Sequence, residues 1–240
     1  MAEELTVESL PLADRLTAAN LVGRRAAWTL DTFPAQAGTT VLSDAARGYA
    51  RVAAPAPPGL LFIGPTGIGK TGLAVGIARA RVEAGDGGYY AWQMAVSAVV
   101  NRRDPSRPAP RLSPGPVWFE TWPELKLRLR RAAEGQDVSE GVLVEELLRV
   151  PLLVLDDIGL GAYTEWREEI LWLLLGRVED GRRLVVTSNL SPLQLQRVIG
   201  ERNADRLCDP ATFRVVGVRR GESLRQRVRK LPPDGRRYDA

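Results

Sequence analysis

The chain has no histidine and only one cysteine, Cys208, among its 240 residues. Without histidine, neither a Ser-His-Asp nor a Cys-His nucleophile can form, and no imidazole can bind a metal. A single cysteine excludes an intramolecular disulfide and a metal cage of several thiolates. Hydrolases and metal centres built from these groups are therefore excluded.

Long apolar runs are also missing, and lysine is scarce. No stretch of about 18 apolar residues occurs, so we expect no membrane-spanning helix. The first residues, Met1–Glu4, are acidic and lead into no apolar run, so no signal peptide is predicted and we expect a cytoplasmic protein. The three lysines are Lys70, Lys126 and Lys230, against thirty arginines.

The charges are unevenly distributed, although the net charge is only +4. Residues 101–131 carry eight basic and three acidic side chains, and residues 214–240 carry nine and three. Residues 140–180 carry three basic and ten acidic side chains. This segregation indicates one face for polyanions and another for a basic partner or a neighbouring subunit. Codon bias is an alternative explanation for the many arginines, and the sequence leaves it open.

Length and composition suit one α/β domain, with 45% hydrophobic and 26% charged residues and no internal repeat. Helical spacing occurs over residues 46–52, from the glycine-rich loop to Glu83, over Trp122–Ala133 and over Trp166–Val178. The proline-rich residues 104–117 predict an exposed loop. Strands that alternate with helices imply a parallel sheet covered on both faces. We predict strands at Leu60–Ile63, Tyr89–Trp92, Leu152–Leu155, Leu184–Ser188 and Phe213–Val218.

A complete G-x-x-x-x-G-K-T loop follows the first predicted strand. Its glycines let backbone N–H groups surround an anion, and the helix that follows directs its positive end to the same point. Lys70 can reach the β- and γ-phosphates, and the Thr71 hydroxyl can ligate Mg²⁺. We expect ATP and Mg²⁺ to be held by Gly64, Pro65, Thr66, Gly67, Ile68, Gly69, Lys70, Thr71 and Gly72.

Two further strands end in polar side chains, at the sheet edge where the phosphates are expected. Asp156 and Asp157 follow Leu152–Leu155, and we expect Asp156 to hold Mg²⁺ through its waters. Asp157 is the candidate to accept a proton from the attacking water or to orient it. Asn189 follows the fourth strand and can hydrogen-bond that water or the γ-phosphate. The alternative for Asn189 is a turn that caps the next helix.

These motifs together resemble the DnaC/IstB branch of the AAA+ ATPases, which includes helicase loaders and transposition helper ATPases. The resemblance extends from about Ala19 to Arg229, and within it the segment Asn20–Phe33, with its Thr32-Phe33, resembles the stretch that precedes the core in this family. Its carriers are Gly64–Thr71, Leu152–Gly159 (LLVLDDIG), Leu184–Ser191 (LVVTSNLS) and Gly200–Leu207 (GERNADRL).

The resemblance implies further roles. Asn189 matches the sensor-one position, and Arg206 matches the arginine finger that reaches the γ-phosphate of a neighbouring subunit. Arg225 matches the sensor-two arginine in a looser motif. The alternatives are a surface salt bridge of Arg206 to Asp205 or Glu201, and a plain basic tail around Arg225.

The expected fold is therefore an AAA+ P-loop NTPase with a five-stranded parallel sheet between helices. About 22 residues follow the fifth strand, so the lid is expected to be minimal or absent. We expect a short N-terminal lead over residues 1–19, the ATPase domain over 20–231 and a tail over 232–240. The short lead leaves open whether a helicase or transposase is bound.

The basic residues 101–131 suggest contact with single-stranded DNA, because such binders combine cationic grooves with aromatic stacking faces. The alternative is a solvated basic helix whose tryptophans pack on the sheet. Candidate contacts are Arg102, Arg103, Trp118, Arg128, Arg130 and Arg131.

The favoured function is an ATP-hydrolysing, helicase-loader-like factor of DNA replication that self-associates through its ATP site. The ATP-binding helper of a transposase shares every motif above and stays an alternative. A nucleotide-switched binding module with little turnover is a third, because a finger supplied in trans leaves a single subunit weakly active. A small-molecule kinase is disfavoured, since the T-S-N-L-S and Arg206 motifs have no role there.

Overall fold

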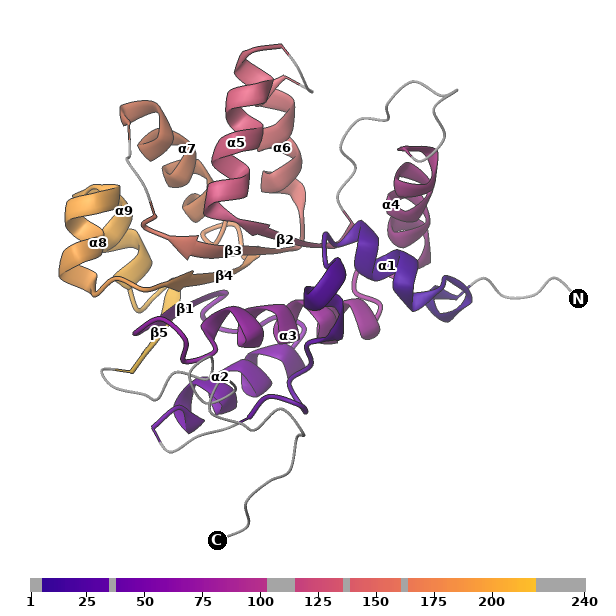
Figure 1. Cartoon of the computed structure of the whole chain (residues 1–240), viewed down its shortest axis with the longest axis horizontal. Coiled ribbons are helices and arrows are strands. Elements are labelled where there is room, and N and C mark those ends of the chain that lie inside the picture. Colours follow the sequence, from indigo (N-terminus) through magenta and orange to yellow (C-terminus); the bar gives the residue numbers. More distant parts are fainter. Residues whose placement is uncertain (1–5, 35–37, 103–114, 136–138, 161–163, 219–240) are drawn as a thin grey trace, which may run out of the picture.

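The computed structural model describes residues 6–34, 38–102, 115–135, 139–160 and 164–218. Figure 1 shows a twisted sheet with helices on both faces. All strand pairs are parallel, and the strand order is β2-β3-β4-β1-β5. The predicted five-stranded parallel sheet is confirmed. The strands are β1 Gly59–Ile63, β2 Val117–Thr121, β3 Leu152–Ile158, β4 Arg183–Ser188 and β5 Phe213–Gly217.

The helices form two layers, one on each face of the sheet (Figure 1). The first layer holds α1 Leu12–Ala18, α2 Thr40–Arg51, α3 Lys70–Glu83 and α4 Gly88–Arg102. The second holds α5 Trp122–Ala133, α6 Glu140–Arg149, α7 Glu165–Gly176, α8 Pro192–Ile199 and α9 Glu201–Cys208. In β1, Leu60 and Phe62 pack on the first layer, and Leu61 and Ile63 on the second. Both faces of the strand are buried, which explains why it is apolar without alternation.

The predicted second strand at Tyr89–Trp92 is wrong, because these residues lie in α4. Trp92, Ala95 and Val96 are buried at the spacing of one helix face, whereas Tyr90 and Met94 on the opposite face are exposed. The true second strand, β2, begins at the end of the segment that we predicted to be a loop. It is only five residues long and runs directly into α5, so it offers little periodicity to recognise.

The N-terminal segment packs against the other helices of the first layer from residue 7 onward. It forms the short 3₁₀ helix η1 Val7–Ser9, then α1, then a second 3₁₀ helix, η2 Gly23–Ala27. Leu16 and Ala19 are buried in the core of the first helix layer. The Phe119 N–H of β2 donates to the Ala19 carbonyl at 3.0 Å, and Asn20 Nδ2 donates to the Phe119 carbonyl at 2.8 Å. The segment that we expected to be a lead is thus tied to the edge strand.

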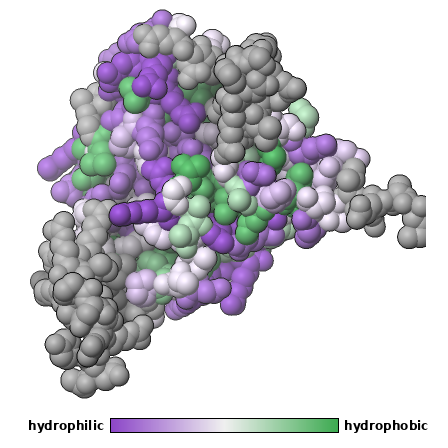
Figure 2. Space-filling view, turned by 45° about the vertical axis from the view of Figure 1, so that its right-hand side comes forward, coloured by the Kyte–Doolittle hydropathy of each residue, from purple (hydrophilic) through white to green (hydrophobic). Residues whose placement is uncertain are grey.

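The visible surface is mixed in character. Figure 2 shows hydrophobic residues interspersed among hydrophilic ones on one face of the molecule. Across the described ranges, no helix combines the length and hydrophobicity that crossing a membrane requires. The predicted C-terminal tail, residues 232–240, lies outside the described residues.

Candidate nucleotide-binding site

The loop after β1 has the backbone that an anion cradle requires. Gly64, Gly67 and Gly69 have backbone φ values of +154°, +91° and +96°, which residues other than glycine rarely adopt. A Cβ on Gly64 would lie 2.7 Å from Ile68 Cδ1 and 2.8 Å from the Val218 carbonyl oxygen. Helix α3 begins at Lys70, directly after the third of these glycines. The N–H groups at the start of this helix therefore point toward the loop.

Lys70 joins the loop to the end of β4. Its side chain is 5% exposed. Its Nζ donates to the carbonyls of Gly64 at 2.7 Å and Pro65 at 2.8 Å, and to Asn189 Oδ1 at 2.7 Å. Asn189 Nδ2 in turn donates to Asp157 Oδ1 at 3.0 Å. The structure therefore brings together three residues that span 119 positions of the sequence.

The two aspartates stand at an irregularity in β3. The β3–β4 register shifts between Leu155 and Ile158, and Asp157 has a φ of +59°. A non-glycine residue in this region is uncommon, but Asp is one of the residues that tolerate it best. Backbone strain of this kind clusters at functional sites.

Asp156 is more deeply buried than Asp157, with 2% of its surface exposed. Burial raises the pKa of its carboxyl to about 6, and the negative charge of Asp157 acts in the same direction. The hydroxyls of Thr187 and Thr71 and the positive charge of Arg25 lower this pKa. The Thr71 hydroxyl lies beside the Asp156 carboxyl group.

A pocket of about 1170 Å³ opens over the loop, large enough for a nucleotide-sized ligand. On the sheet side it is lined by Asp157, Leu160 and Asn189, and along the loop by Thr66, Gly67, Gly69, Lys70, Thr71 and Gly72. Its other wall comes from the N-terminal segment and consists of Arg24, Arg25, Trp28, Thr29, Thr32, Phe33 and Pro34.

This second wall was not predicted from the sequence. A Cβ placed on Gly72 would lie 3.8 Å from the Phe33 ring and 4.0 Å from the Trp28 ring, so both aromatic residues stand over the first turn of α3. Trp28 is 40% exposed, which leaves an aromatic surface in the pocket. Thr32-Phe33 formed part of the family resemblance, but no role was predicted for either residue. The available signal was the two aromatic residues, Trp28 and Phe33, in the stretch before the core.

The donor set fits a hard divalent cation only in part. Carboxylate and hydroxyl oxygens, as in Asp156 and Thr71, are the ligands that Mg²⁺ prefers. Among the described residues, no cluster of three or more His, Cys, Asp or Glu side chains can hold a metal. Any Mg²⁺ here needs phosphate oxygens or waters as further ligands, which matches how Mg²⁺ binds in nucleotide sites.

Arg206 does not line the pocket but is engaged within its own subunit. Its Nη2 lies 2.7 Å from Glu179 Oε1, and its Nη1 donates to the Trp172 carbonyl at 3.0 Å. Its guanidinium also lies over the Trp172 ring, 3.3 Å from the centroid. The expected alternative partners, Asp205 and Glu201, are not those that the structure shows. Arg225 lies outside the described residues.

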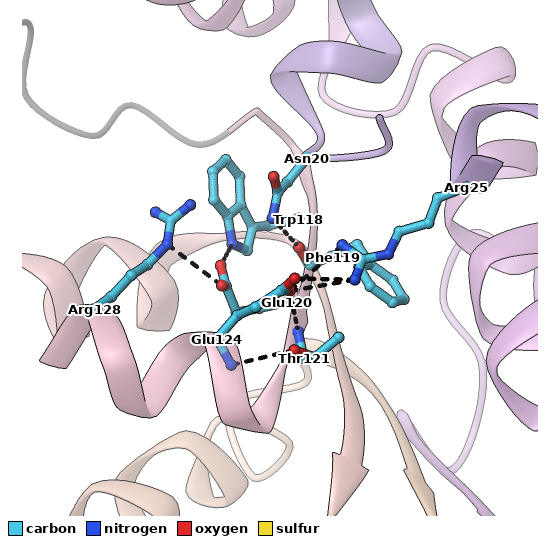
Figure 3. A network of polar contacts seen from close by, with 8 residues as sticks. All are labelled: Asn20, Arg25, Trp118, Phe119, Glu120, Thr121, Glu124 and Arg128. Atoms are coloured by element: carbon cyan, nitrogen blue, oxygen red, sulfur yellow. Dashed lines mark hydrogen bonds and ion pairs between the residues drawn. The ribbon is translucent and has the colours of Figure 1, made fainter. Parts of the chain in front are cut away.

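The candidate DNA contacts differ in their surroundings. Trp118 is 4% exposed, so it does not offer a stacking face, and this expectation is corrected. Figure 3 shows its indole N–H donating to Glu120 Oε2 at 2.9 Å, with Arg128 Nε 3.4 Å from Glu120 Oε1. Arg130 and Arg131 are exposed on α5. Arg102 is the last residue of α4, and Arg103 lies outside the described residues.

Comparison with known protein families and with curated proteins finds no sequence match. Among solved structures, the chain matches the DnaC helicase loader at a TM-score of 0.58 and 18% identity, covering 82% of this chain and 100% of that one. It matches AMPPCP-bound DnaA from Aquifex aeolicus at 0.60 and 14% identity, covering 84% and 53%. It matches DnaA bound to AMPPCP and single-stranded DNA at 0.61 and 13% identity, covering 85% and 55%.

The chain thus spans about half of these DnaA structures and the whole of the DnaC structure. At such low identity the likeness concerns the fold. The P-loop NTPase fold that we expected from the contiguous motifs is the fold of these structures. The chain has the fold of the AAA+ P-loop NTPases, as DnaC and DnaA do.

Proposed function

We propose that this protein binds ATP with Mg²⁺ over the Gly64–Gly72 loop and hydrolyses it to ADP and phosphate, as a helicase-loader-like factor in DNA replication. The observation that carries the proposal is the chain of hydrogen bonds from Lys70 through Asn189 to Asp157. It joins a phosphate-binding cation to a carboxylate across the edge of the sheet where the pocket opens.

The residues of the site have separate roles in this proposal. The loop N–H groups and Lys70 hold the phosphates, and Thr71 with Asp156 would hold Mg²⁺. When bound, Mg²⁺ neutralises charge on the β- and γ-phosphate oxygens. Asp157 lines the pocket, so its carboxylate can orient the attacking water and accept its proton. Trp28 and Phe33 offer aromatic surface to the base.

Assembly would complete the site. Arg206 is held by Glu179 and the Trp172 carbonyl, so as a finger in trans it would have to exchange these partners for a γ-phosphate. We propose that self-association drives this exchange. Specific ATPase activity is then expected to rise with protein concentration, and Arg206→Ala is expected to abolish that rise. A rise that survives in Arg206→Ala would refute the role in trans.

Single-stranded DNA remains a proposed ligand, now through Arg130 and Arg131 of α5. It is supported by their exposure and by the similarity to a DnaA structure that contains single-stranded DNA. A replicative helicase is the proposed protein partner. The transposase-helper alternative uses the same site, and pull-down with each candidate partner separates the two.

The central test compares wild type with Lys70→Ala and with Arg149→Ala. The latter removes an exposed charge of α6 that lies outside the pocket. Lys70→Ala is expected to weaken ATP binding by about 10- to 100-fold, because it removes a buried cation from the phosphates. Arg149→Ala is expected to bind as wild type does. Unchanged ATP binding in Lys70→Ala, measured by calorimetry, would overturn the site.

A further inference from the structure

Thr187 is a polar residue at a fully buried position of the central strand β4. It follows Leu184, Val185 and Val186, which are buried apolar residues, and its own exposure is 0%. A buried hydroxyl without partners destabilises a fold, so its hydrogen bonds indicate why it is there.

Both hydrogen bonds of Thr187 go to the acidic pair of β3. Its Oγ1 donates to Asp156 Oδ1 at 2.6 Å and accepts from the Asp157 backbone N–H at 3.0 Å. Because the Asp157 N–H occupies an acceptor position, the hydroxyl proton is directed toward the carboxylate. One side chain therefore sets an oxygen of Asp156 and the backbone of Asp157.

The shift in the β3–β4 register explains why a side-chain hydrogen bond is needed at this point. Leu155 pairs with Val186 and Ile158 with Ser188, so Asp156 and Asp157 of β3 face the single residue Thr187 of β4. A bulge of this kind leaves ladder groups unpaired and reorients the strand. The shifted ladder leaves the Asp157 N–H without a backbone partner on β4, and the Thr187 hydroxyl accepts a hydrogen bond from it. In this arrangement Asp157 keeps its left-handed backbone and its carboxylate reaches Asn189.

We infer that Thr187 is a positioning residue that holds Asp156 beside Thr71 for the cation and turns Asp157 into the pocket for the water. This inference rests on the proposed function, because it assigns Thr187 to the same site. The hydroxyl carries the effect, whereas the methyl group only fills space.

The test uses Thr187→Val, which keeps the shape without the hydroxyl, and Thr187→Ser, which keeps the hydroxyl. Ser188→Ala is the matched control. Ser188 is equally buried in β4, but its hydroxyl donates to the Ile158 carbonyl at 2.7 Å and accepts from Leu190 N–H at 3.2 Å, so it touches neither carboxylate. Melting temperatures of all three variants give the purely structural cost.

Thr187→Val is expected to lower kcat by about 10- to 100-fold, with little change in KM for ATP, and Thr187→Ser is expected to restore kcat. The Mg²⁺ concentration needed to strengthen binding of a fluorescent ADP analogue is expected to rise by a similar factor. Binding of that analogue in EDTA is expected to stay at the wild-type level. In the protein without metal or nucleotide, the Asp157 amide is expected to exchange its hydrogen about tenfold faster in Thr187→Val.

Two results would overturn the inference while leaving the proposed function intact. One is wild-type kcat and Mg²⁺ dependence in Thr187→Val. The other is an equal loss of kcat in Ser188→Ala at the same melting temperature. If wild type shows no Mg²⁺-dependent nucleotide binding, the proposed function itself fails. The Asp157 amide exchange then still decides whether Thr187 positions the pair.

Discussion

Two neighbouring strands each carry a buried carboxylate near their carboxyl ends, and the two are surrounded differently. Glu120 of β2 lies on the α5 side, with the Trp118 indole N–H at 2.9 Å and Arg128 Nε at 3.4 Å (Figure 3). Asp156 of β3 lies beside Thr71 at the start of α3 and accepts from Thr187. Burial raises both pKa values, to about 7 for Glu120 and about 6 for Asp156.

The difference indicates that burial alone does not identify a candidate functional carboxylate. The partners of Glu120 are Trp118 of its own strand and Arg128 of the neighbouring helix α5. Glu120 does not line the pocket. Asp156 is adjacent to a pocket whose floor holds Lys70 and Asp157. A raised pKa marks a functional site only when geometry supplies a place for a ligand.

Matched amide substitutions are expected to separate the two carboxylates most strongly. Asp156→Asn is expected to lower kcat for ATP by about a thousandfold or more, because it removes the anionic ligand that balances the cation. Glu120→Gln is expected to change kcat by less than about twofold. Steady-state ATPase assays at saturating Mg²⁺ measure both. Equal losses in the two variants would mean that the comparison is wrong.

Removal of an aromatic side chain from the N-terminal wall is expected to have an intermediate effect. Trp28→Ala is expected to weaken binding of ATP by about tenfold, since a base stacked on an aromatic ring gains one to three kcal/mol. Binding of inorganic triphosphate, which lacks a base, should be unaffected. Calorimetry with both ligands checks this, and parallel losses for the two would place the base elsewhere.

The smallest effect on activity, and the clearest on stability, is expected from Glu120 as the pH changes. Its folded pKa of about 7 lies above the ordinary value of 4.5, so its stabilising contribution is complete below pH 4.5 and is lost as the pH rises through 7. The loss amounts to about 3 kcal/mol above pH 7. Glu120→Gln is expected to flatten this part of the stability curve.

Urea unfolding of wild type and Glu120→Gln between pH 4.5 and 8 measures the effect. Asp156→Asn serves as the control from the other strand, because it should remove a fall in stability that lies about one pH unit lower and leave the Glu120 fall in place. Identical slopes for wild type and Glu120→Gln would show that Arg128 keeps Glu120 ionised without cost.

Much of the site was predictable because its parts are contiguous. The G-x-x-x-x-G-K-T loop carries its own turn geometry and helix start, so Gly64, Gly69 and Lys70 take their places by local rules. Three apolar runs before polar residues predicted β1, β3 and β4 to within a few residues. The strand predicted at Tyr89–Trp92 was wrong, although it rested on the same kind of signal, an apolar run. An apolar run after a glycine turn suits either a strand or a helix, and packing on the sheet decides between them.

The residue order alone thus determined a glycine-rich loop before a helix, an acidic strand end and the class of sheet that joins them. Packing of distant segments established the rest: the bond of Lys70 to Asn189, the Trp28 wall, the capture of Arg206 by Glu179 and the burial of Trp118. The reason is physical. Backbone turns follow from adjacent residues, whereas the partner of a side chain depends on which faces the folded chain brings together.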